Sequence, residues 1–298
     1  MRRMSPSRID TAVTRMLGIR YPIIAAPMFL VSNAALLEAA GRAGAIGAVP
    51  SLNFRTAQAY RDFLATFPKD VPFGVNLILK WAERLEEDVA ATVERKVPLV
   101  ITSLGDPTPV VERVHAYGGK VWSDVISLRH AEKAVKAGVD ALVAVGSGAG
   151  GHAGNLSPMV LGPWLKQELG VPVVLAGALS TGRHLAATLA LGLDGAYLGT
   201  RFLATEEAGA AADYKQALVD SSPEDLEYTK EVTGVHGNFL KSALERFRAG
   251  QGKAWKDTWS AGQGVAFVKD VLPAATVVER MVREYTEARA ALPSVDVG

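Results

Sequence analysis

The sequence contains no cysteine among its 298 residues, which excludes disulfides, cysteine–metal sites and thiol catalysis. Net charge is nearly absent as well: the formal value of +1 gives no reason to expect nucleic acid or an anionic membrane as a partner. The longest nearly apolar run, Tyr21–Val31, is too short to span a bilayer and holds two prolines. No apolar stretch follows the basic residues of Met1–Asp10, so no signal peptide is expected. These absences predict a soluble cytoplasmic protein.

Strand-like and helix-like stretches alternate along the chain as far as about residue 200. Several strands are apolar at successive positions, as expected when both faces of a parallel sheet are covered. The predicted strands are Ile23–Ala26, Ala45–Val49, Phe73–Leu77, Leu99–Thr102, Lys120–Asp124, Ala141–Val145, Val173–Ala176 and Ala196–Leu198. The predicted helices between them are Ala34–Ala43, Thr56–Phe67, Glu83–Lys96, Pro109–Tyr117, Leu128–Ala137, Met159–Leu169 and Gly182–Leu191.

Eight strands in this alternation favour the α/β class and, within it, the (β/α)8 TIM barrel. An open dinucleotide-binding sheet would carry Gly-x-Gly-x-x-Gly after its first strand. Here the first strand runs into Ala26-Pro27-Met28, and the richest glycine loop follows strand six. The barrel is therefore the prediction, and an open eight-stranded sheet is the alternative.

After Arg201 the pattern changes. Residues 206–260 hold the helix-like pieces Ala211–Ser221, Pro223–Thr229 and Phe239–Ala249. The final helix, Ala274–Leu292, has apolar residues at a spacing that forms one buried face. We therefore expect a barrel made of residues 1–205 and 261–298, and a mostly helical insertion or lid, 206–260, between strand eight and the last helix.

The active groups of a barrel lie at the carboxyl ends of its strands. Strand six delivers the glycine-rich loop Val145–Gly154 with His152, a side chain whose unperturbed pKa lies near neutrality. The alternative is a structural role, in which His152 is a loop histidine bonded to backbone carbonyls. That role is less favoured because several candidate loops are expected at the same end of the barrel. Further candidates at strand ends are Pro27, Met28, Asn76, Asp124, Gly177, Ala178, Gly199 and Thr200.

The loops after strands seven and eight, Gly177-Ala178 and Gly199-Thr200, each precede a helix start. Backbone N–H groups at helix starts bind phosphate, and barrels often use these two loops for it. For a single glycine a tight turn is the favoured interpretation, but the pair predicts a phosphate site. Neither His-x-x-x-His nor Gly-x-Ser-x-Gly occurs, so a catalytic metal or a serine nucleophile elbow is not expected.

Other polar residues are interpreted as structural. Asp140 and Asp194 each stand between a helix-ending glycine and a strand, at the amino-terminal face that serves stability in a barrel. The remaining histidines fall in predicted helices or in the insertion and are assigned to surface or packing roles: His115, His130, His184 and His236.

With these motifs together, the chain resembles the nitronate monooxygenase family, formerly called 2-nitropropane dioxygenases. These proteins are flavin-dependent (β/α)8 barrels related to flavin-dependent enoyl-acyl-carrier-protein reductases. The Ala-Gly-Gly-His-x-Gly element followed by Gly-Thr-Arg-Phe is fairly specific to the group. The resemblance covers nearly the whole chain and is carried by Pro22–Met28, Phe73–Leu77, Gly148–Gly154, Ala176-Gly177, Gly199–Glu206 and Ala261–Gln263.

The resemblance implies FMN bound at the barrel mouth. It assigns Gly177, Ala178, Gly199 and Thr200 to the phosphate. It places around the flavin Ala26, Pro27, Met28, Asn76, Asp124, Gly150, Gly151, Gly262 and Gln263. His152 would be the base that takes a proton from a neutral nitroalkane, or would position an anionic nitronate. The flavin would then pass electrons from the nitronate to O2, and a carbonyl compound and nitrite would leave.

Three departures from the family pattern stand out. Ala178 replaces the second glycine after strand seven, Ser147-Gly148-Ala149 replaces the segment before Gly-Gly-His, and Asp124 stands where relatives carry a longer amide or a lysine. An anion at Asp124 would disfavour a negative charge on the flavin or nitronate. Two other functions stay open: an NAD(P)H-dependent flavin reductase of a quinone or enoyl thioester, and a non-catalytic barrel that binds a phosphorylated metabolite. A homo-oligomer is also open.

Overall fold

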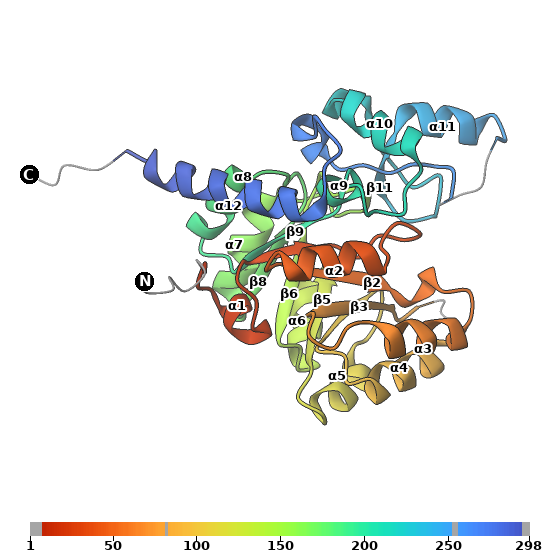
Figure 1. Ribbon diagram of the computed structural model, residues 1–298, viewed down its shortest axis with the longest axis vertical. Coiled ribbons are helices and arrows are strands. Elements are labelled where there is room, and N and C mark those ends of the chain that lie inside the picture. Colours follow the sequence, from red (N-terminus) through yellow and green to blue (C-terminus); the bar gives the residue numbers. More distant parts are fainter. Residues whose placement is uncertain (1–7, 81–82, 252–255, 294–298) are drawn as a thin grey trace, which may run out of the picture.

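In the computed structural model, eight parallel strands close into a barrel with helices outside it (Figure 1). The strands are β1 (Ile23–Ala25), β2 (Ile46–Pro50), β3 (Phe73–Ile78), β4 (Leu99–Ser103), β5 (Lys120–Val125), β6 (Ala141–Val145), β8 (Val173–Ala176) and β9 (Gly195–Leu198). The ring closes because β1 pairs with both β2 and β9. The described residues are 8–80, 83–251 and 256–293, so most of Met1–Asp10 lies outside them. The predicted (β/α)8 barrel is confirmed.

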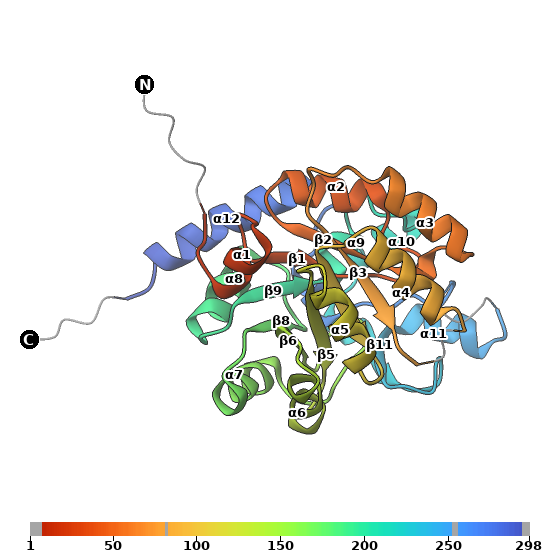
Figure 2. The ribbon, with the colours of Figure 1, turned by 90° about the horizontal axis from the view of Figure 1, so that it is seen from below.

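The outer helices follow their strands in sequence, and Figure 2 shows α2 to α7 arranged around the barrel. Their bounds are α2 (Ala34–Arg42), α3 (Ala57–Thr66), α4 (Leu85–Glu94), α5 (Thr108–His115), α6 (Leu128–Lys136), α7 (Pro158–Leu169), α8 (Gly182–Ala190), the short α9 (Thr200–Leu203) and the last helix α12 (Ala274–Ala290). Within the described ranges, no helix combines the length and apolarity that a bilayer crossing requires.

The barrel interior is a packed core. Side chains alternate between the two faces of each strand, so Trp122 of β5 points inward while Val121 and Val125 belong to the outer cluster. The inward set includes Ile24, Ile46, Ile101, Val143, Val174 and Tyr197. Burying each large apolar side chain stabilises the fold by about 1.5–3 kcal/mol.

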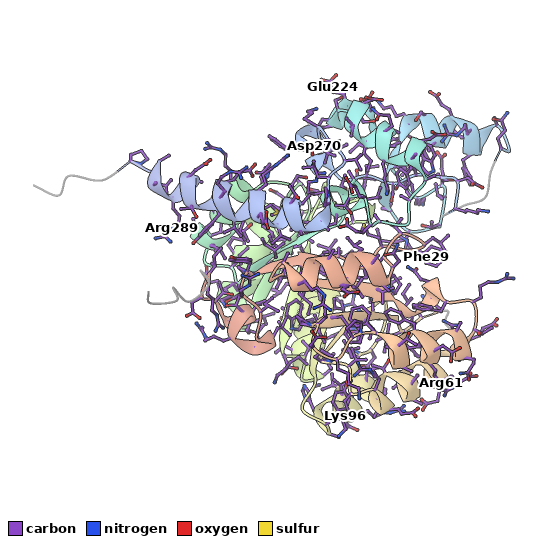
Figure 3. The ribbon with its side chains drawn as sticks, in the orientation of Figure 1. Phe29, Arg61, Lys96, Glu224, Asp270 and Arg289 are labelled. Carbon is purple, nitrogen blue, oxygen red and sulfur yellow. The ribbon has the colours of Figure 1, made fainter. Side chains whose placement is uncertain are left out.

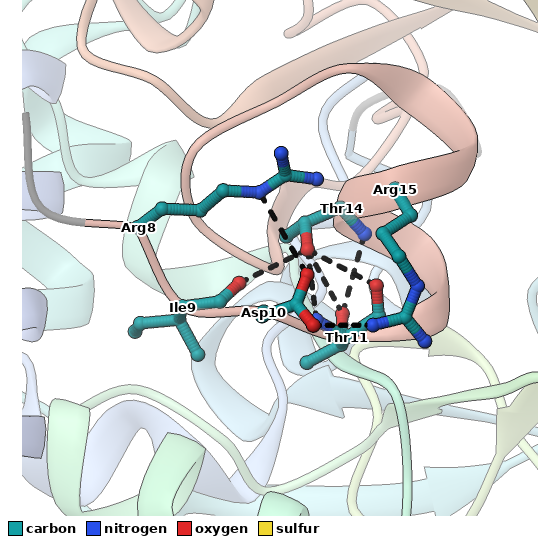
Figure 4. Close-up of polar contacts among 6 residues, drawn as sticks. All are labelled: Arg8, Ile9, Asp10, Thr11, Thr14 and Arg15. Carbon is teal, nitrogen blue, oxygen red and sulfur yellow. Dashed lines mark hydrogen bonds and ion pairs between the residues drawn. The ribbon is translucent and has the colours of Figure 1, made fainter. Parts of the chain in front are cut away.

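Helix α1 (Ala12–Leu17) closes the amino end of this interior. Val13 packs in the same cluster as Trp122, whose indole N–H also contacts Met16 Sδ at 3.3 Å. Thr11 caps the helix by accepting from the Thr14 N–H at 3.2 Å, and the Thr14 hydroxyl donates to the Ile9 carbonyl (Figure 4). The core is therefore sealed at one end, which leaves the carboxyl end for a site.

The two aspartates at the strand entrances make structural hydrogen bonds. Asp140 accepts from the Val121 N–H at 2.8 Å, and Asp194 accepts from the Val173 N–H at 2.9 Å. Each carboxylate also binds a lysine, Lys120 or Lys166 respectively. These bonds agree with the structural interpretation of both residues.

The insertion lies on the carboxyl side of the barrel. Figure 3 shows its residue Glu224 and Lys96, which precedes β4, at opposite ends of the molecule. It contains α10 (Ala212–Asp220), a 3-10 turn (Pro223–Asp225), strands β10 (Leu226–Thr229) and β11 (Gly237–Leu240), and α11 (Lys241–Arg248). The prediction of a helix over Pro223–Thr229 is wrong, because Leu226–Thr229 pairs antiparallel with Gly237–Leu240. A short segment shows too little periodicity to distinguish a strand from a helix when its partner is unknown.

Candidate active site

Three polar side chains face the carboxyl end of the barrel interior from neighbouring strands. Asp124 follows the inward Trp122 by two residues on β5, and Ser103 follows the inward Ile101 by two residues on β4. On β3, Asn76 stands between two residues of the outer cluster and so faces inward. Because the carboxyl ends of barrel strands form the active-site face, the predicted residues Asn76 and Asp124 are both at the mouth.

These side chains form one hydrogen-bonded chain. The Asn76 side-chain N–H groups donate to the Ile101 carbonyl at 3.0 Å and to Ser103 Oγ at 2.8 Å. The Ser103 hydroxyl donates to Asp124 Oδ2 at 2.6 Å. Asp124 Oδ1 is buried and has no hydrogen-bond partner among the described residues. Burial raises the pKa of Asp124 to about 6, although the Ser103 hydrogen bond acts in the opposite direction.

A second unpaired polar atom belongs to the same interior. Tyr197 of β9 is part of the inward cluster, and its hydroxyl is buried without a partner in the described part of the chain. Burial raises the pKa of Tyr197 well above its ordinary value, and the charge of Asp124 raises it further. Unpaired buried polar atoms are rare in folded proteins, so each calls for an explanation such as a bound molecule that supplies the partner.

His152 lies in β7 (Gly151–His152) and is half-buried. Its Nε2 is 3.2 Å from Thr233 Oγ1. The Thr233 hydroxyl donates to the Val235 carbonyl, so Thr233 Oγ1 can accept a proton from His152 Nε2. Burial lowers the pKa of His152, which favours the neutral ring. A neutral imidazole of this kind can accept a proton.

The insertion holds the glycine loop that carries His152. The Asn238 side chain donates to the Ala149 carbonyl at 2.7 Å, and the Ala153 N–H donates to the His236 carbonyl at 3.1 Å. The Tyr228 hydroxyl donates to the Ala153 carbonyl at 2.9 Å. Neither Asn238 nor Thr233 is predicted from the sequence, because no motif links them to a loop more than eighty residues away.

The glycines let three backbone segments meet. The Gly148 carbonyl accepts from both the Ala178 N–H at 3.2 Å and the Gln263 N–H at 2.8 Å. A Cβ added to Gly262 would lie 2.6 Å from the Gly148 oxygen, and one added to Gly150 would lie 2.8 Å from the Gly262 nitrogen. Side chains at these positions would push the segments apart. The structure therefore brings together the predicted residues Gly150, Gly262 and Gln263, with Gly151 next along the loop.

The ends of β8 and β9 offer backbone donors. Among the described residues, no acceptor is found for the N–H groups of Gly199 and Thr200, whereas the pairing of Ala176 with Tyr197 turns the Gly177 N–H toward β9. Ala178 differs, because its N–H is bonded to the Gly148 carbonyl and its φ of +59° lies in the left-handed region that favours glycine. The predicted segment Ala26-Pro27-Met28 borders this edge, since the Ala26 N–H donates to Leu198 and Met28 Sδ lies beside Gly199.

The start of α8 does not supply the free donors that we expect from the sequence. The N–H groups of Ser180 and Thr181 point to His184 Nδ1, at 3.3 and 3.2 Å. The Gly182 N–H donates to Glu284 of α12 at 2.7 Å. These two side chains cap the helix, so an anion at this mouth would depend on the donors of Gly199 and Thr200.

The residues at the mouth fit a flavin. The backbone donors of Gly199 and Thr200 suit an anionic phosphate, and the unpaired atoms of Asp124 and Tyr197 suit the polar edge of a ring. The glycine loop and the 261–263 segment give a wall without bulky side chains. Such a mouth, at the carboxyl ends of the strands, is where the enzymes of the (β/α)8 class have their active sites.

Comparisons with known proteins narrow this class to flavin-dependent oxidoreductases. The nitronate monooxygenase family model matches residues 10–248. A probable nitronate monooxygenase of Staphylococcus saprophyticus is 28% identical, with 94% of this chain and 99% of the relative covered. The chain thus belongs to the nitronate monooxygenase family.

Two solved structures share the fold over almost their entire length. FabK from Thermotoga maritima matches with a TM-score of 0.86 and 27% identity, covering 95% of this chain and 98% of that one. Nitroalkane oxidase from Streptomyces ansochromogenes matches with a TM-score of 0.83 and 26% identity, covering 95% and 100%. Both confirm the barrel.

Proposed function

We propose that this protein binds FMN at the barrel mouth and oxidises alkyl nitronates, and nitroalkanes after deprotonation, with O2 to carbonyl compounds and nitrite. The observation that carries the proposal is the half-buried His152 on a glycine loop, in a member of the nitronate monooxygenase family. The similarity to a nitroalkane oxidase points to the same substrates. When bound, the flavin supplies the electron transfer between nitronate and oxygen.

The phosphate of FMN would be held by backbone N–H groups rather than by a cation. Gly199 and Thr200 would supply the donors, and the left-handed backbone at Gly177 and Ala178 turns the chain between β8 and α8 beside them. A single phosphate also suits the one cluster of donors at the ends of β8 and β9 better than a dinucleotide does.

His152 would act on the carbon acid. The ring is held beside the Thr233 hydroxyl, and in its neutral form an imidazole can accept a proton from the carbon beside the nitro group. The resulting imidazolium would then hold the anionic nitronate by charge. A nitronate supplied as the anion does not need the base, so the two substrates report different steps.

The test compares both substrates on one variant. Purified protein should be yellow, and aerobic addition of ethyl nitronate should consume O2 and release nitrite. His152→Ala should keep FMN and lose about 10²-fold or more of the activity on neutral nitroethane, with a smaller loss on ethyl nitronate. Wild-type turnover of nitroethane by this variant would remove His152 from the base role.

Two controls separate the rival functions. Anaerobic bleaching of the flavin by NADH but not by the nitronate would indicate an NAD(P)H-dependent reductase of a quinone or enoyl thioester. A colourless protein that does not bind added FMN but binds a sugar phosphate would indicate a barrel that binds a phosphorylated metabolite. His130→Ala, an exposed histidine on α6, controls for loss of a histidine as such.

A further inference from the structure

The hydrogen-bond chain at the mouth has a fixed direction. The Ile101 carbonyl can only accept, so the Asn76 side-chain atom beside it must be the NH2 group. The same NH2 donates to Ser103 Oγ, which leaves the single Ser103 proton for Asp124 Oδ2. With this direction, Asp124 accepts at Oδ2.

This direction decides where Asp124 can carry a proton. Since Oδ2 is occupied by the Ser103 hydroxyl, the proton of a neutral Asp124 belongs on Oδ1, the buried oxygen without a partner among the described residues. A neutral Asp124 would therefore present an O–H donor into the mouth. The buried Tyr197 hydroxyl, which also has no partner within that part of the chain, is a second donor in the same interior.

The surroundings of Asp124 do not favour an anion. Ser103 and Asn76, on β4 and β3, are neutral, and among the described residues no lysine, arginine or histidine contributes to the pKa of Asp124. The titratable group coupled to its charge is Tyr197 on β9, and the carboxylate makes ionisation of that phenol harder. A buried carboxylate with one oxygen unpaired is costly, and a neutral acid that donates to a ligand is not.

We propose that Asp124 binds the flavin as a neutral carboxylic acid, donating from Oδ1 to an acceptor on the polar edge of the ring with Tyr197 as a second donor, so that flavin binding takes up one proton. The inference rests on the proposed flavin site. The protons balance as follows. The free protein with an ionised Asp124 carboxylate binds the flavin and one proton from solvent, and the product is the complex in which Asp124 is the neutral acid. An acid in this position would take over the donor role of the amide or lysine that the family resemblance expects there.

The sign of the pH dependence follows from the free protein. With the pKa of Asp124 raised to about 6 by burial, the carboxyl is mostly ionised at pH 7 before binding. Binding that requires the neutral acid then weakens as the pH rises above that value, by up to about tenfold in Kd per pH unit, until the pKa of the complex is reached. Below pH 6 the carboxyl is already neutral and this dependence disappears.

The experiment measures the Kd of FMN for the flavin-free protein by fluorescence quenching between pH 5.5 and 8.5. Asp124→Asn keeps a neutral donor at every pH, and the FMN phosphate titrates alike with both proteins. The ratio of the wild-type Kd to the Asp124→Asn Kd therefore isolates the carboxyl. It should be flat below about pH 6 and rise toward roughly 100-fold at pH 8. Asp106→Asn, an exposed acid in the loop after β4, is the matched control and should keep the wild-type pH dependence.

Proton uptake provides a second measurement that needs no variant. Calorimetric titrations of the wild type with FMN at pH 7.5, in buffers of different ionisation enthalpy, should show close to one proton taken up per flavin. A flat Kd ratio with no proton uptake, or a ratio that falls as the pH rises, would overturn the role of Asp124 and leave the proposed function intact. A protein that binds no FMN at any pH would instead refute the flavin site itself.

Discussion

Removal of the Asp270 carboxylate should destabilise this protein more than removal of the partly exposed Arg280 charge beside it. Asp270, labelled in Figure 3, precedes α12 and faces the guanidinium of Arg201, whose side chain is 4% exposed. Arg201 Nη1 donates to Asp270 Oδ1 at 3.0 Å, and Nη2 donates to the carbonyls of Asp270 and Ala204 at 2.8 and 2.7 Å. Arg201 thereby ties the loop after β9 to the start of the last helix.

The magnitude follows from the burial of the cation. Asp270→Ala leaves the Arg201 charge buried with carbonyl partners alone, and breaking a buried ion pair in this way costs about 3–5 kcal/mol. We expect the lower end, because Asp270 itself is 31% exposed and water can reach the gap. Arg280 donates to the other Asp270 oxygen at 2.8 Å but is 36% exposed, so Arg280→Met should cost at most about 1 kcal/mol.

Urea unfolding at pH 7, followed by circular dichroism on the flavin-free chain, measures both variants, and equal m-values are needed for the comparison. Asp270→Asn keeps an acceptor but no charge, so its loss of unfolding free energy should lie between the losses in Asp270→Ala and Arg280→Met. The reasoning fails if Asp270→Ala costs less than about 1 kcal/mol, or if Arg280→Met costs as much as Asp270→Ala.

Three further changes test other parts of the structure. Thr233→Val removes the hydroxyl beside His152 Nε2 and should lower kcat on neutral nitroethane about tenfold and shift its pH profile. Thr233→Ser should restore both, and an unchanged profile in Thr233→Val would contradict the role of this hydroxyl in positioning His152. Gly262→Ala adds a methyl group 2.6 Å from the Gly148 oxygen, at an ordinary φ of −89°. The steric clash should lower the free energy of unfolding, measured by heat or urea, by about 1–3 kcal/mol. Wild-type stability in this variant would show that the two segments can move apart without cost. Burial acts to raise the pKa of Asp140, but its hydrogen bonds and Lys120 lower the pKa overall. The stability lost in Asp140→Asn should therefore be largest at neutral pH and should shrink as the pH falls below about 4. A stability loss that grows on acidification would contradict this direction of the pKa shift.

The barrel is predictable from the sequence because its strands are apolar on both faces. Runs such as Ala141–Val145 carry that signal locally, and the observed bounds of β6 are the same as the predicted ones. The mouth is predictable for a related reason. Once a strand is placed, alternation decides which of its side chains face inward, so Asn76 and Asp124 follow from the strand bounds.

The contacts that the sequence does not reveal are those between distant segments. Thr233 meets His152 across 81 residues, and Glu284 caps α8 across 102 residues. Such pairs depend on how the insertion and α12 pack on the barrel, and no local pattern encodes that packing. The β10–β11 hairpin is missed for the same reason, since Leu226–Thr229 becomes a strand through pairing with Gly237–Leu240.

The central claim is that a flavin at this mouth takes electrons from a nitronate. The most direct measurement is the visible spectrum of the purified protein in an anaerobic cuvette, before and after ethyl nitronate is added, and again after air is admitted. The account predicts a flavin spectrum that changes with the nitronate and returns in air as nitrite accumulates. The central claim would be contradicted by a flavin spectrum that does not change with the nitronate and is bleached by NADH. It would also be contradicted by a protein with no flavin spectrum even after incubation with FMN.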